Sequence, residues 1–168
     1  MTTERETNWV EKIGGNAYSA ILEMVQSLQC DWERLAELRE ERDDWDAEAE
    51  GEGWADANPE EAEELAQLEA DAGDCESEDD ARDRITEDPL SLEYRSGWTS
   101  PGQDMEPEEF CLLLATGGPA VRIVGEIGYG EAARPRLQVQ DWGKPWTEYL
   151  DADQSVLEAY CQCFCFDI

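Results

Sequence analysis

Carboxylates at helical spacing are the residues of this chain whose types and positions suggest chemistry. Residues 40–80 contain 20 Asp or Glu and a single base, Arg42. Pairs such as Glu40 and Asp44 are four residues apart, which on a helix separates them by about 6 Å along the axis. This step is comparable to that between phosphates on one nucleic-acid strand. Because the arginine and lysine side chains that clamp phosphate also bind carboxylates, such a row can take the place of a phosphate backbone.

The acidic charge of the whole chain is far greater than solubility requires. The 168 residues include 12 Lys or Arg and 43 Asp or Glu, for a net charge of −31. Residues 40–80 carry −19 of it, whereas residues 1–30 contribute −2 and residues 89–168 contribute −8. A net charge of magnitude about 2–8 serves a small domain, and self-repulsion at this level destabilises the folded state. We therefore expect the charge to serve binding.

The sign of the charge indicates the class of partner. An acidic surface repels nucleic acid and anionic lipid, so neither a direct nucleic-acid contact nor a membrane contact is expected. The expected partner is a basic nucleic-acid-binding protein or a ribonucleoprotein complex. The candidate partner-binding residues are Glu37, Glu40, Glu41, Asp43, Asp44, Asp46, Glu48, Glu60, Glu61, Glu63, Glu64, Glu69, Asp71, Asp79 and Asp80.

Several kinds of catalytic and metal site are disfavoured by the composition. The chain has no His, which excludes Ser-His-Asp and Cys-His catalysis and every His-containing zinc site. No carboxylate pair is singled out for glycoside hydrolysis. The segment Asp46–Gly51 approaches a calcium-binding loop, but Ala57 stands where the bidentate Glu should be. We therefore expect no enzymatic activity, no cofactor and no metal site.

Six cysteines are present, and three of them, Cys161, Cys163 and Cys165, alternate near the C-terminus. On a strand these three would share one face, which is poor geometry for three ligands of a tetrahedral metal ion. Free Cys often packs as a small hydrophobe. The preferred interpretation is reduced thiols that pack in the core, with metal or redox chemistry as the open alternative.

Helical patterns dominate the first half of the chain. Apolar residues recur at three- and four-residue steps from Asn16 to about Ala49, which predicts an amphipathic helix capped by Asn16 and preceded by Gly14-Gly15. Asn58 as cap with Pro59 at the first position predicts a second helix that ends at Gly73. Residues 73–88 are either an exposed loop or a short helix.

Two tryptophans lie within the acidic block. Trp45 and Trp54 either anchor the acidic region to a core or serve as interface aromatics, since both uses are common for Trp.

Strand patterns dominate the second half. Strands are expected at residues 90–98, 110–116, 120–127 and 136–142, with Gly117-Gly118 as a hairpin turn. A helix over residues 104–115 is the alternative to the second strand. A short helix capped by Asp151 or Asp153 and a last strand over residues 161–168 complete the pattern.

The predicted fold class is therefore α+β, with acidic helices followed by a mainly antiparallel sheet. Residues 1–88 form the helical region and residues 89–168 the sheet region, and we expect the two to make one compact unit. The sequence has no run of 18 apolar residues and no signal-peptide pattern at its start, so a cytoplasmic location in a host bacterial cell is expected.

Three stretches in the sheet region carry a resemblance: Glu93–Trp98, Phe110–Arg122 and Leu137–Gly143. They resemble small proteins found on phages, plasmids and integrative elements, over roughly the last 80 residues and without a catalytic motif. In charge and size the chain is similar to DNA-mimic inhibitors of restriction enzymes and CRISPR effectors. The resemblance implies an anti-restriction or anti-CRISPR inhibitor that occupies the DNA- or RNA-binding groove of a host defence nuclease. The alternative is an acidic chaperone or antitoxin-like protein that shields a basic partner.

Overall fold

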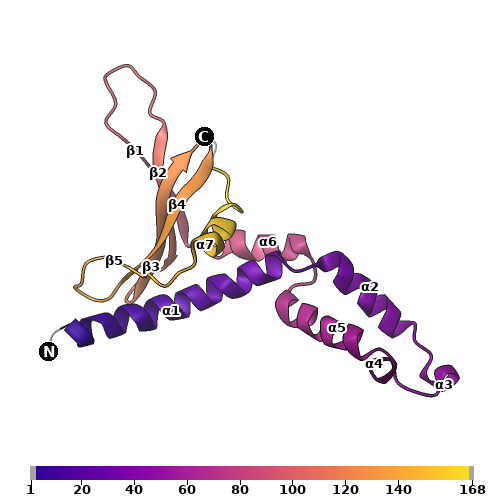
Figure 1. Cartoon of the computed structure of the whole chain (residues 1–168). Coiled ribbons are helices and arrows are strands. Elements are labelled where there is room, and N and C mark those ends of the chain that lie inside the picture. The colour runs from indigo at the N-terminus through magenta and orange to yellow at the C-terminus, as the bar shows by residue number, and fades with distance from the viewer. Residues whose placement is uncertain (1–2, 167–168) are drawn as a thin grey trace. The chain divides into compact units, whose positions relative to one another are not determined.

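The computed structural model describes the backbone of residues 3–166 and the side chains of residues 8–166. Its elements confirm the α+β class, because helices make up the N-terminal part and a five-stranded antiparallel sheet follows. The chain forms two compact units (Figure 1). Residues 26–82 make the first, which we call the acidic unit, and residues 1–25 with 83–168 make the second, which we call the sheet unit. Residues 1–25 thus join the sheet unit, although they precede the acidic helices in sequence.

The long helix predicted from Asn16 to about Ala49 is in fact three helices. The elements are α1 (Thr3–Leu28), α2 (Trp32–Asp43) and α3 (Ala47–Glu50). The first break is fixed locally, because the Asp31 side chain accepts a hydrogen bond from the backbone N–H of Arg34 and so caps α2. The indole N–H of Trp32 also donates to the Ser27 carbonyl at 3.1 Å, which holds the two helix ends together across the break.

The prediction that Asn16 caps the first helix is wrong, since α1 begins before it and includes Gly14-Gly15. Gly14 is needed here for close approach. A Cβ at this position would lie 2.4 Å from the Tyr149 ring, so only glycine lets the helix pack against that side chain. The rings of Tyr18 and Tyr149, 6.2 Å apart between centroids, extend the same contact.

The remaining helices of the acidic region follow the sequence pattern more closely. They are α4 (Trp54–Ala57), α5 (Pro59–Ala72) and α6 (Glu78–Glu87). Helix α5 has the predicted ends, but the Asn58 side chain does not cap it and instead donates to the Trp54 carbonyl at 3.0 Å. Within residues 73–88, the short-helix alternative is the correct one.

The sheet has the strand order β1-β2-β3-β4-β5, with every neighbouring pair antiparallel. Its strands are β1 (Ser91–Ser96), β2 (Pro107–Ala115), β3 (Ala120–Gly128), β4 (Glu131–Gln140) and β5 (Thr147–Glu148). The strand reading of residues 110–116 is confirmed over its helical alternative. Sequential neighbours pair throughout because each connection is a hairpin-type loop.

One face of the sheet is buried and the other is not. The inward face carries alternate apolar residues, with Phe110 and Leu112 on β2, Ile123 on β3, and Leu137 and Val139 on β4. Helix α7 (Gln154–Cys161) packs along β4 on this side, capped by Asp153 as predicted. Within the described part of the sheet unit, no helix covers the opposite face, which we call the open face (Figure 1).

The predicted C-terminal strand is wrong over residues 161–166, and residues 167 and 168 lie outside the described part. Helix α7 continues through Cys161, and turns follow it. The three alternating cysteines therefore do not share one face. Cys161 is buried, and its burial raises the pKa of the thiol, whereas Cys163 is half-buried and Cys165 is exposed. Of these three cysteines, Cys161 alone is fully packed in the core.

A buried tyrosine fastens α7 to the chain segment that follows α6. The Tyr160 hydroxyl donates to Asp88 Oδ2 at 2.5 Å, and burial together with this carboxylate raises the pKa of the phenol. Among the helices that the structure describes, none is long and apolar enough to cross a membrane.

Candidate protein-interaction surface

The acidic unit has a hydrophobic core of its own. Leu35, Leu38, Trp54, Leu65 and Ala72 are buried together. Partly buried side chains pack around them: Cys30, Trp32, Trp45, Ala62 and Leu68. Helices α2, α4 and α5 each contribute, so their acidic faces are held by packing and do not belong to a flexible tail.

The two tryptophans of the acidic block are both used inside this unit. Trp54 is buried in the core, and Trp45 packs against it while its indole N–H donates to the Glu52 carbonyl at 3.0 Å. This fits the anchoring interpretation, with the difference that the core they join is that of the acidic unit itself. The chain between α2 and α4 is thereby fixed at both tryptophans.

Three arginines of α2 tie it to α5 through ion pairs. Arg34 contacts Glu64 Oε2 at 2.9 Å, and Arg39 and Arg42 contact Glu69 Oε1 at 3.3 and 3.4 Å. The hydrogen bond from Arg34 lowers the pKa of the Glu64 carboxyl, and the same bond raises the pKa of Arg34. These groups are exposed, where an ion pair contributes only about 0–1 kcal/mol. Their main effect is to offset the repulsion between the acidic helices α2 and α5.

The candidate residues divide into three groups by what their side chains contact. Glu37, Asp43, Glu64 and Glu69 are in ion pairs with arginines of α2. Asp46, Asp71 and Asp80 accept hydrogen bonds from within the unit. Among the side chains that the structure describes, the remaining eight make neither an ion pair nor a hydrogen bond: Glu40, Glu41, Asp44, Glu48, Glu60, Glu61, Glu63 and Asp79.

The clearest row of carboxylates lies on α2. Glu37, Glu40, Glu41 and Asp44 recur at helical spacing and together line one shallow hollow. All four are exposed, on the side of α2 opposite Leu35 and Leu38. The unpaired members Glu40, Glu41 and Asp44 are therefore available to a partner without breaking any ion pair. The structure brings these four together, while Asp79 and Asp80 lie on α6 instead.

The segment that approached a calcium-binding loop has a different geometry. Asp46 caps α3 by accepting hydrogen bonds from the backbone N–H groups of Glu48 and Ala49, and Gly51 ends that four-residue helix. In the described part of the chain, no group of three or more His, Cys, Asp or Glu is placed to hold a metal ion. The acidic surface is thus organised by helices and not by a cation-binding loop.

Sequence reasoning did not single out the arginines of the sheet. The register of β3 and β4 places Arg122 and Arg136 on the open face of the sheet. The alternation of buried and exposed positions along each strand is a signal that would have placed them.

Salt should stabilise the free protein. The exposed ion pairs among the described side chains would each lose at most about 1 kcal/mol on screening. Repulsion within a chain of net charge −31 is relieved at the same time, and this effect is the larger because carboxylates greatly outnumber bases. We expect the melting temperature to rise by about 5 °C or more between low salt and 0.5 M NaCl.

The matched control for this measurement is a variant with Glu40→Gln, Glu41→Gln and Asp44→Asn. It should melt at a higher temperature than the natural chain at low salt and respond less to added NaCl. A melting temperature that falls as NaCl is added would show that the ion pairs stabilise the chain more than carboxylate repulsion destabilises it, contrary to this prediction.

No family model, no curated protein and no solved structure matches this chain.

Proposed function

We propose that the chain is a nucleic-acid-mimic inhibitor that occupies the DNA- or RNA-binding groove of a host defence nuclease complex, either a CRISPR effector or a restriction enzyme. The observation that carries the proposal is the acidic unit: 57 residues with net charge −19 fold around their own core and present unpaired carboxylates on helices. Folding makes the spacing of the charges fixed, which a disordered acidic tail does not achieve.

The charge density supports a phosphate-like role. Carboxylates four residues apart on α2 are separated by about 6 Å along the helix axis. One such pair is Glu37 and Glu41, and a second pair, Glu40 and Asp44 at the end of the helix, lies beside it. Arg and Lys side chains that bind phosphate bidentately can bind such carboxylates with the same donors. The mechanism is occupancy, so it requires no catalytic group.

The decisive experiment is a cleavage assay with competition. Plasmid DNA is exposed to a restriction endonuclease or a CRISPR effector with and without the protein, and duplex DNA without the target site is then added. We expect cleavage to be blocked and the added duplex to release the inhibitor, because both compete for one groove. Inhibition that excess duplex leaves unchanged would exclude the mimic mechanism.

The same assay separates the alternative. If cleavage by each class of nuclease proceeds unhindered while the protein protects a basic non-nuclease protein from aggregation, the acidic chaperone or antitoxin-like function replaces the proposal.

A further inference from the structure

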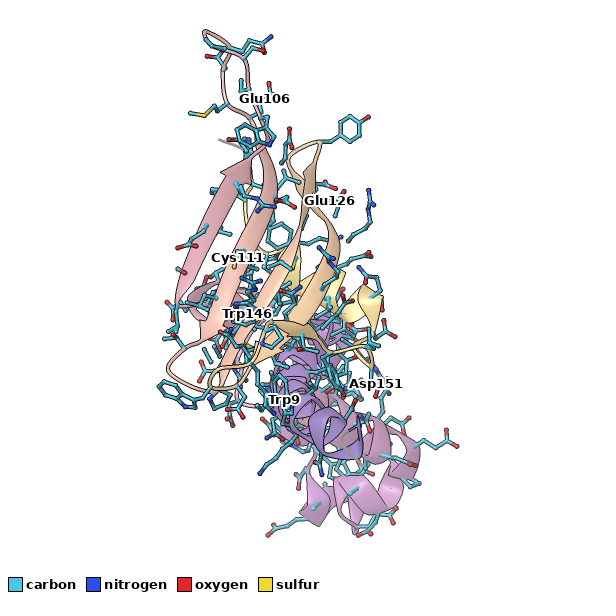
Figure 2. All side chains as sticks on the ribbon, turned by 90° about the vertical axis from the view of Figure 1, so that its left-hand side faces the viewer. Trp9, Glu106, Cys111, Glu126, Trp146 and Asp151 are labelled. Carbon is cyan, nitrogen blue, oxygen red and sulfur yellow. The ribbon has the colours of Figure 1, made fainter. Side chains whose placement is uncertain are left out.

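The open face of the sheet carries a second charged site, distinct from the acidic unit. Strand register places Glu93, Cys111, Val124 and Arg136 in one row across β1 to β4. Figure 2 looks onto this face, with Cys111 near its middle and Trp146 towards its lower end. A hollow of about 350 Å³ lies here.

Two arginines in this hollow have no carboxylate partner. Among the arginine side chains that the structure describes, Arg84, Arg122 and Arg136 make no ion pair. Their neighbours on the same face do, since Arg95 pairs with Glu109 and Arg134 with Glu126. In a chain with 43 acidic residues and 12 basic ones, two neighbouring guanidinium groups that no carboxylate pairs with are an unusual arrangement.

Arg122 is held in a fixed position. Its Nε donates to Gln138 Oε1 at 2.9 Å, and the guanidinium lies over the Trp146 ring at 4.1 Å from the centroid. Gln138 is the cross-strand partner of Arg122, and Arg136 is two residues from Gln138 on the same face of β4. Arg136 is therefore the diagonal neighbour of Arg122, about 7–8 Å away at Cα, within reach of long side chains. The two guanidinium groups can converge on one ligand.

The acidic residues of the hollow lie at its other side. Glu109 is engaged by Arg95. Glu93 is on β1, three strands from Arg136 on β4, a separation of about 14 Å at the usual strand spacing. On the outer side of β4, Glu148 of β5 is the cross-strand partner of Gln138 and therefore a diagonal neighbour of Arg136, but the two make no ion pair. With two guanidinium groups against this one carboxylate, the end of the hollow formed by β3 and β4 is net positive, although the chain as a whole is strongly negative.

We propose that this end of the open face binds the phosphate group of a small ligand through Arg122 and Arg136. A phosphate group carries about −1.5 to −2 charges at pH 7, which matches two guanidinium groups, whereas a carboxylate would leave one of them unpaired. The fork of each arginine presents two parallel N–H donors to such an oxyanion. The site is independent of the proposed inhibition, because it lies on the sheet and needs no partner protein.

The test is a titration of the full chain with inorganic phosphate, followed by ¹H–¹⁵N NMR at an ionic strength of about 0.15 M, where the acidic unit is screened beyond about 8 Å. We expect saturable shifts at Cys111, Val124 and the two arginines, with a Kd of about 1–10 mM. Arg136→Gln and Arg122→Gln should each weaken binding about tenfold, the loss of one charge-assisted contact. Arg134→Gln should leave the Kd unchanged, since Arg134 is paired with Glu126 on the same face.

Two further measurements make the result decisive. Binding of inorganic phosphate should weaken as the pH is lowered and the dianion takes up a proton to become a monoanion, while binding of sulfate, which stays a dianion, should not change. Because Arg136 is exposed, its substitution leaves the fold intact even where Arg122→Gln disturbs the sheet through Gln138 and Trp146. The proposal would be overturned if Arg134→Gln and Arg136→Gln lost the same affinity for phosphate. It would equally be overturned if acetate bound as tightly as phosphate, or if phosphate produced no saturable shifts.

Discussion

Replacing Glu40, Glu41 and Asp44 together by lysine is expected to weaken inhibition of the target nuclease by at least about 100-fold at physiological salt. The three side chains are exposed and in no ion pair, so the substitutions remove no contact within the acidic unit. Each change adds two positive charges, which moves the net charge from −31 to −25 and makes the row on α2 repel a basic groove. Like charges placed opposite each other at an interface cost several kcal/mol. The concentration of protein that halves cleavage is the quantity to measure.

The matched control makes the same change in net charge, but at residues outside the acidic unit. Glu106→Lys, Glu131→Lys and Glu148→Lys alter three exposed residues of the sheet unit and also give −25. If charge alone mattered, the two variants would inhibit equally, and the mimic proposal would lose its dependence on the α2 row. We expect the control to lose little at 0.15 M salt, where screening beyond about 8 Å limits the influence of distant charges. Inhibition by the natural chain should itself weaken steeply as salt is raised.

The sequence predicted which segments are helices and strands better than where the first helices end. Apolar residues continue at helical steps through Leu28 and Leu38, so periodicity alone joins α1 to α2. The break depends on a cap by Asp31 and on the indole of Trp32, both of which are local contacts that a periodic pattern does not weigh. The prediction that Gly14-Gly15 precedes the first helix is wrong for a different reason: Gly14 lies inside α1, where Tyr149, distant in sequence, occupies the space that a Cβ would need.

At the C-terminal cysteines, a strand-like pattern in the sequence is overridden by the packing of a helix. Cys161, Cys163 and Cys165 alternate as they would in a strand, but Leu157, Tyr160 and Cys161 are buried together at helical spacing. A three-residue alternation carries less information than the burial of a helix against β4, so tertiary packing decides the outcome.

For the candidate surface, the sequence shows how many carboxylates there are, but not which of them are held in ion pairs and which are available to a partner. It identified the fifteen carboxylates, and it could not tell that Glu64 and Glu69 are held by arginines of α2 while Glu40 and Glu41 remain unpaired. Such pairs join residues about 30 positions apart, so they follow from how α2 and α5 pack. The same is true of Arg122 and Arg136, whose adjacency depends on the register of β3 and β4.

The core of the acidic unit offers a test that holds the charge constant. Leu38 is fully buried, at 0% exposure, among Leu35, Trp54 and Leu65. Leu38→Ala should destabilise this unit by about 2–5 kcal/mol through lost burial and a residual cavity. A unit of 57 residues has only about 3–9 kcal/mol of stability in total, and self-repulsion reduces it. We therefore expect residues 26–82 to exchange amide hydrogens rapidly in this variant while the strands stay protected.

The consequence for inhibition distinguishes a fixed array of carboxylates from charge alone. Leu38→Ala keeps every Asp and Glu and the net charge of −31, but it loosens the helices that space them. Because a disordered segment must be ordered on binding, the mimic should lose inhibition by a factor comparable to the loss of folded population. Leu90→Ala, at a residue 61% exposed in the sheet unit, is the control and should change neither exchange nor inhibition. Full inhibition by a Leu38→Ala chain whose acidic unit is unfolded would mean that the target reads only the density of negative charge, and the phosphate-like spacing on α2 would then have no role.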